Sequence, residues 1–126
     1  TTGKQVKELN HILSAIQIME FQQLVRKIPI ADNVLEYAVT LASKTRPGTD
    51  LATAEVNNYI SWGAGPRASQ YLVLGAKCHA AISGKYSPDK SDVQAIANYV
   101  LRHRIVRNYK AEAEGVTEED VITHLL

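Results

Sequence analysis

The chain has little of what disulfide-rich, metal-binding or membrane proteins need. Its 126 residues include one cysteine and one methionine, and aromatic residues make up only 6%. A lone cysteine, Cys78, can neither close an internal disulfide nor build a thiolate metal site, and this usage favours the cytoplasm. No apolar run approaches the ~18 residues that a membrane-spanning helix requires. We therefore expect a cytoplasmic protein with no membrane segment.

The chain also has a small net charge and lacks the common metal-binding and phosphate-binding sequence motifs. The formal net charge is +1, so no overall field attracts nucleic acid or an anionic membrane. The histidines are scattered without metal-ligand spacing, which predicts no metal site. A G-x-x-x-x-G-K-[ST] phosphate loop is missing, because Gly84-Lys85 is followed by Tyr86 and has no partner glycine. We expect no catalytic residue in this chain and no cofactor bound by it alone.

The first residues differ from the rest. Met19 lies inside a helical pattern, so the chain does not start at an initiator and we expect a piece of a longer protein. Residues 1–13 carry only a loose apolar pattern, which fits either an extended arm or an irregular helical turn. We interpret 1–13 as an N-terminal arm or linker and 14–126 as one domain.

Apolar residues then recur at three- and four-residue steps, which predicts an all-α bundle of five to six helices. Ser14 and Gln17 form a capping box before a helix over about 15–27. Asp32 is the expected N-cap of the second helix, which Pro47-Gly48 ends. Further helices are expected over about 54–60, 66–83, from a cap at Ser87 or Ser91 to about 101, and from Thr117 onward. Thr117 and Asp120 form a second capping box at the start of this last helix. No strand is predicted.

The stretch 61–71 (SWGAGPRASQY) is the most informative one. Gly63 and Gly65 permit positive φ, and Pro66 suits the first position of a helix. Arg67 then lies in the first turn, where a cation opposes the helix dipole at a cost of roughly 0.3–1 kcal/mol. Loop glycines, free amides and a guanidinium together fit a phosphate. The alternative is a local ion pair with Asp50 or Glu55.

Trp62 and the segment Arg102–Lys110 each allow two interpretations. Trp62 could stack on a ligand or cover the end of the bundle. The segment Arg102–Lys110 interleaves basic and apolar residues, so a stand-alone helical adaptor that binds protein or nucleic acid through this surface is the competing functional class. Within helix 66–83, Cys78 and His79 point ~100° apart and are interpreted as core or helix-edge residues rather than a nucleophile pair.

Four segments in order resemble the C-terminal helical lid of MoxR-type AAA+ ATPases, which are related to magnesium chelatase ATPase subunits. They are YAVTLASKTRP (37–47), GAGPRAS (63–69), VLRHRI (100–105) and NYKAEAEG (108–115). The resemblance extends over about 14–126. Gly65 stands where the family usually has serine, a change that keeps the N-cap at a few tenths of a kcal/mol but removes a hydroxyl. Residues 86–92 also depart from the family's usual helix start.

The resemblance implies a lid that closes over ATP and Mg²⁺ bound to a core domain outside this chain. It implies that Arg67 is the sensor arginine that contacts the γ-phosphate, with Gly63, Gly65 and Pro66 in the loop near the nucleotide. The implied partners are the chain's own AAA+ core, neighbouring subunits of a ring, and proteins with von Willebrand A-type domains, in a chaperone-like machine. Arg46, His103 and Arg104 also fall in family motifs and are interpreted as structural.

Overall fold

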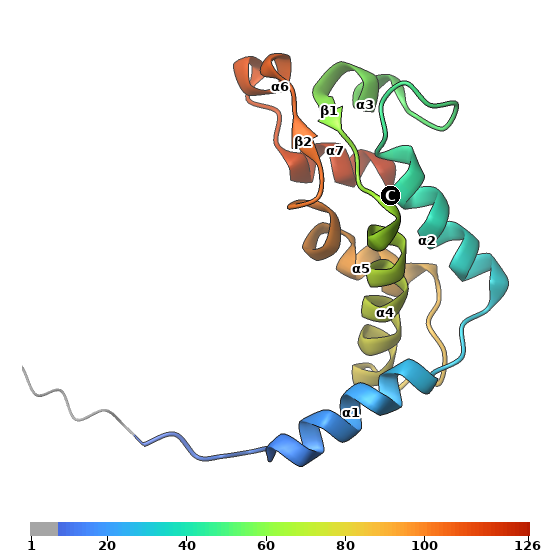
Figure 1. Ribbon diagram of the computed structural model, residues 1–126, viewed down its shortest axis with the longest axis vertical. Helices are drawn as coiled ribbons and strands as arrows, with labels where there is room; N and C mark the ends of the chain where they lie inside the picture. Colours follow the sequence, from blue (N-terminus) through green and yellow to red (C-terminus); the bar gives the residue numbers. More distant parts are fainter. Residues whose placement is uncertain (1–7) are drawn as a thin grey trace, which may run out of the picture.

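The computed structural model describes residues 8–126, and the bundle in it is organised around one long helix. The helices are α1 (Ala15–Lys27), α2 (Asp32–Lys44), α3 (Ala54–Tyr59), α4 (Pro66–Ile82), α5 (Lys90–Leu101), α6 (Tyr109–Glu114) and α7 (Glu118–Leu125). Helix α4 packs mainly against α5 and α2, and α1 lies across one end of it (Figure 1). The predicted all-α class is confirmed, and α6 is a helix beyond those expected.

Helix α4 can pack closely because its buried positions are small. Ala68, Leu72, Ala76 and Ala80 are fully buried at four-residue steps. The same helix approaches α5 at Gly75, where an added Cβ would lie 3.2 Å from the Ile96 side chain. The apolar residues Tyr71 and Ile82 of the same helix are exposed, and the small residues Ala76 and Ala80 are buried at the helix contact instead.

The core continues from α4 into the neighbouring helices. Its largest fully buried apolar side chains are Leu41, Val56, Leu72, Val93, Leu101, Val121 and Ile122. The predicted capping boxes of Ser14 with Gln17 and of Thr117 with Asp120 are both present. The predicted caps Ser87 and Ser91 are wrong, because the Asp89 carboxylate accepts the Ser91 and Asp92 amides and caps α5. Asp32 is the first residue of α2, whose N-cap is Ala31.

A short antiparallel ribbon joins two distant segments, which the sequence did not predict. Strand β1 (Ile60–Trp62) pairs with β2 (Val106–Arg107), with an irregularity between Ile60 and Trp62. The ribbon lies with α3 and α6 at the end of the molecule opposite α1 (Figure 1). It ties the segment that leads into α4 to the segment that follows α5.

The predicted N-terminal arm is described only in part. Residues 1–7 lie outside the described residues, and residues 8–13 form no helix and are exposed. Within residues 8–126, no helix is long and apolar enough to span a bilayer.

Candidate functional site

The loop 63–65, which leads into α4, is clamped by the C-terminal end of α2. The Thr45 hydroxyl accepts a hydrogen bond from the Ala64 amide at 2.8 Å and donates one to the Ala42 carbonyl at 2.6 Å. Thr45 is 1% exposed, so both bonds are shielded from water. The hydroxyl therefore joins α2 to the start of α4.

Arg46 completes this clamp. Its Nε donates to the Ala64 carbonyl at 2.8 Å, so consecutive residues of one segment bind both backbone polar groups of Ala64. The interpretation of Arg46 as a link between helices agrees with this geometry. Thr45 lies in the same motif, and the sequence analysis assigned it no role.

Gly63 is required by close packing rather than by its φ angle. A Cβ added there would lie 2.4 Å from the Thr45 carbonyl oxygen and 2.6 Å from Arg46 Cα. The expectation of positive φ at Gly63 and Gly65 is wrong, because Gly48, Gly84 and Gly115 are the glycines at positive φ in the described chain. The loop is thus held by backbone contact across two segments.

Arg67 follows this clamped loop as the second residue of α4, and its side chain is exposed to solvent. Gly65 is the N-cap of α4 and Pro66 is its first residue, as predicted. The Arg67 side chain is exposed, and within residues 8–126 no carboxylate lies within 4.0 Å of its guanidinium. The alternative ion pair with Glu55 or Asp50 does not form; Glu55 instead lies 3.2 Å from His124 Nδ1.

A second cation lies on the same side of α4. Tyr71 follows Arg67 by one helical turn, and helical side chains lean toward the preceding turn. The Arg104 guanidinium lies 4.8 Å from the Tyr71 ring centroid, donates to the Val100 carbonyl at 2.6 Å and contacts the His103 ring nitrogen. The structure therefore brings Arg104 against Tyr71 in α4, a contact that their separation in sequence concealed.

Trp62 does not cover the end of the bundle. It is 73% exposed on β1, opposite Val106, which is 53% exposed. The interpretation as a bundle cover is wrong, since the irregular pairing of β1 leaves this side chain on the outside. Stacking on a ligand stays a prediction.

The basic segment Arg102–Lys110 is largely engaged within the chain. Arg107 binds Glu118 Oε1 at 3.0 Å and the Val116 carbonyl at 2.9 Å. Arg102 lies 3.8 Å from Glu119, and the Lys110 ammonium lies over the Tyr59 ring. These contacts pair the cations with acidic or aromatic partners on different elements, which disfavours the stand-alone adaptor.

A polar cluster joins α4 to α5 far from Arg67. Asp92 is fully buried, and its carboxylate contacts His79 Nδ1 at 2.7 Å and Lys85 Nζ at 3.0 Å. Burial alone would raise the pKa of Asp92. Hydrogen bonds from the Asp89 amide, His79 and Lys85 outweigh this, so that its pKa is lowered. His79 is therefore a helix-edge residue with a structural partner.

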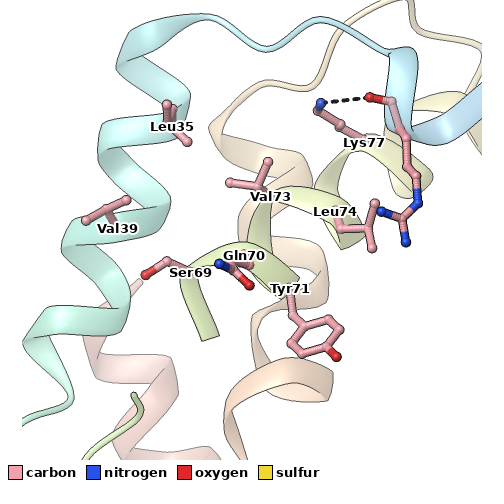
Figure 2. A pocket seen from close by; sticks show the side chains of 9 residues that line it. Leu35, Val39, Ser69, Gln70, Tyr71, Val73, Leu74 and Lys77 are labelled. Carbon is pink, nitrogen blue, oxygen red and sulfur yellow. Dashed lines mark hydrogen bonds between the residues drawn. The ribbon is translucent and has the colours of Figure 1, made fainter. Parts of the chain in front are cut away.

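An open groove lies between α2 and α4, toward α1. Figure 2 shows Leu35 and Val39 of α2 on one side of the groove and Val73 of α4 toward them, with Leu74 farther from α2. The groove has a volume of about 600 Å³. Within residues 8–126, no group of three or more His, Cys, Asp or Glu side chains could hold a metal ion. The groove thus has apolar side chains from both helices and is also lined by Ser69, Gln70, Arg26 and Lys77.

Comparison with known proteins identifies a family and several relatives of this chain. The sequence model of the AAA lid domain matches residues 52–125. Chaperone MoxR1 of Mycobacterium tuberculosis is 29% identical over 124 residues, which cover 98% of this chain and 33% of MoxR1. The uncharacterized protein YeaC of Bacillus subtilis is 22% identical over 96% of this chain and 35% of its own length.

A solved structure agrees with these relatives. A crystal structure from Cytophaga hutchinsonii, described as that of a "putative ATPase", superposes with a TM-score of 0.81 at 28% identity. The match covers 87% of this chain and 33% of that one. The chain thus spans about a third of the length of the proteins that it matches.

Proposed function

The chain belongs to the AAA lid domain family, and from that premise we propose that it is the lid of a MoxR-type ATPase, with Arg67 as its nucleotide sensor. The exposed guanidinium, which has no carboxylate partner among residues 8–126, supports this role best. An arginine donates several N–H groups to phosphate oxygens, and the N-terminal end of α4 adds a favourable dipole. The γ-phosphate of ATP on the core would supply the missing negative charge.

The residues around Arg67 fit the phosphate side of such a site. Gly65 leaves the N-terminal end of α4 open, since nothing lies within 4 Å of a Cβ added there. The clamp on Ala64 fixes the direction in which α4 begins, and Arg104 keeps the local charge positive. ATP would supply the phosphoanhydride bond that is hydrolysed. Loop 63–65 has no carboxylate, so we expect Mg²⁺ to be held by residues outside this chain.

The wider role follows by analogy with the family. We expect the lid to contact its own core and neighbouring ring subunits, in a cytoplasmic, chaperone-like machine that assembles or activates enzyme complexes. Partners with von Willebrand A-type domains belong to the same proposal. In this scheme Arg67 couples the phosphate state to the angle of the lid.

The direct test is Arg67→Ala in the full-length parent protein. We expect ATP turnover to fall by about 10²-fold, the usual effect of removing one group that stabilises charge at a reacting centre. Arg102→Ala is the matched control, because Arg102 is also exposed and its contacts are long, 3.8 Å to Glu119 and 6.0 Å to the centroid of the Tyr99 ring. Unfolding of the 126-residue chain should show no loss of stability in Arg67→Ala, since the substitution removes a cation opposed by the helix dipole. Wild-type turnover in Arg67→Ala would remove the proposal.

A further inference from the structure

Helix α1 is an amphipathic helix that the rest of the bundle does not enclose. At ~100° per residue, its inner side carries Ile18, Phe21 and Val25, and polar residues occupy most of its outer side. The inner side lies over α4 across a hollow of about 510 Å³, to which Leu74 and Cys78 contribute. None of the residues of α1 is buried, and Ile18 and Phe21 are 45% and 51% exposed. Apolar contact therefore holds α1 only weakly.

Polar contacts between α1 and the other elements are also few. Within residues 8–126, the one hydrogen bond that joins α1 to another helix or strand runs from Lys77 Nζ to the Arg26 carbonyl at 3.5 Å. No ion pair in the same part of the chain involves α1. A long bond that is exposed to water adds little stability. Detaching α1 therefore requires much less free energy than unfolding the bundle.

The chain becomes anchored to the bundle directly after α1. Pro29 prevents α1 from continuing, and Ile28 at its C-terminal end is extended, with φ −62° and ψ 126°. The Pro29 carbonyl accepts a hydrogen bond from the Ser87 hydroxyl at 3.2 Å, and Ile30 packs against the core. A rotation within residues 27–29 would therefore move α1 without disturbing the residues that follow.

We propose that α1 is a detachable strap, which exchanges between a docked position on α4 and a released position by pivoting at residues 27–29. Figure 1 shows α1 lying across the end of α4. Release uncovers the hollow at Leu74 and Cys78. Because Leu74 also lines the groove of Figure 2, the uncovered surface of α4 continues into that groove. Release requires neither nucleotide nor Arg67, so it is independent of nucleotide sensing.

A released α1 does not keep its hydrogen bonds. Isolated helices shorter than about 12–15 residues are marginal in water, and α1 has 13 residues. Its amides therefore become open to hydrogen exchange at each release. Cys78 lies half-buried in the hollow and becomes accessible to thiol reagents in the same event. Two probes in different helices thus report one opening.

Hydrogen exchange of the 126-residue chain, which has its own buried core, measures this release. We expect the amides of residues 19–27 to exchange at least about 100-fold faster than the buried part of α4, after correction for intrinsic rates. Ile18→Ala should speed their exchange about 5-fold, because it removes roughly half of the full burial of one isoleucine. Labelling of Cys78 by a maleimide should become faster by a similar factor.

Ile16→Ala is the matched control. It is the same substitution on the same helix, but Ile16 is 70% exposed on the outer side of α1. Both rates should therefore stay within about 2-fold of wild type, as for ordinary surface changes.

Three results would overturn the strap. Exchange of α1 at the rate of α4 would place both helices in one cooperative unit. Equal effects of Ile18→Ala and Ile16→Ala would assign the exchange to fraying of α1 rather than to its release from α4. An unchanged rate of Cys78 labelling in Ile18→Ala would show that α1 does not cover this side of α4.

Discussion

Gly63→Ala is the sharpest test of the clamped loop. The new Cβ would lie 2.4 Å from the Thr45 carbonyl oxygen and 2.6 Å from Arg46 Cα. Both are backbone atoms and cannot rotate away, so α2 and the loop must separate. Overpacking of this kind costs about 1–3 kcal/mol, and weakening the two hydrogen bonds to Ala64 adds about 1 kcal/mol each. We expect the free energy of unfolding to fall by about 3–5 kcal/mol.

The assay is urea unfolding of the 126-residue chain, followed by circular dichroism at 222 nm. Gly65→Ser is the control, because it also adds a Cβ but at a position with nothing within 4 Å and an ordinary φ of −78°. Serine is a better N-cap than glycine by a few tenths of a kcal/mol, so the control should be neutral or slightly stabilising. A Gly63→Ala protein within about 0.5 kcal/mol of wild type, the range of ordinary surface changes, would refute the close-packing explanation.

Two further predictions concern buried polar groups. Thr45→Val should destabilise the chain by about 1–3 kcal/mol in the same assay, because it leaves the buried Ala64 amide without an acceptor. Thr45→Ser keeps the hydroxyl and should retain most of the stability, and a loss in Thr45→Ser without a loss in Thr45→Val would assign the effect to the methyl group instead. Because the folded-state pKa of Asp92 is lowered, its ionised carboxylate stabilises the folded chain above the unfolded-state pKa of about 3.9. This contribution to the free energy of unfolding is lost as pH falls through the lower folded-state pKa. Asp92→Asn should therefore reduce stability at pH 7 and flatten the decline below about pH 4, and an unchanged acid profile would contradict this assignment.

Local sequence signals predicted local structure well. The capping boxes at Ser14 and Thr117 and the start of α4 at Pro66 depend on residues within one turn of each other, so they could be recognised without tertiary information. The N-cap of α5 was missed although it is local. Ser87, Asp89 and Ser91 lie within five residues and could each cap the helix. Asp89 is the N-cap in the structure, where Lys85 also binds its carboxylate.

What the sequence could not predict depends on contacts between distant segments. Strands β1 and β2 are too short for any periodicity and exist only because residues 60–62 meet residues 106–107. The Thr45–Ala64 bond joins positions 19 residues apart, and the Tyr71–Arg104 contact joins positions further apart still. Arg67 could be singled out because a cation in the first turn of a helix is a local feature, whereas the contacts made by Thr45, Arg46 and Arg104 could not be predicted.

The clamp also changes where motion in the lid is expected. Two glycines around Ala64 suggest a hinge, but a hinge needs backbone that is free to change its angles. Here Thr45 and Arg46 bind both polar groups of Ala64, and Gly63 packs against their backbone. Bending at this loop would break buried hydrogen bonds, whereas movement of the whole bundle would not. A displacement of Arg67 should therefore move α2 and α4 together. We expect the flexible joint at the boundary between the lid and its core.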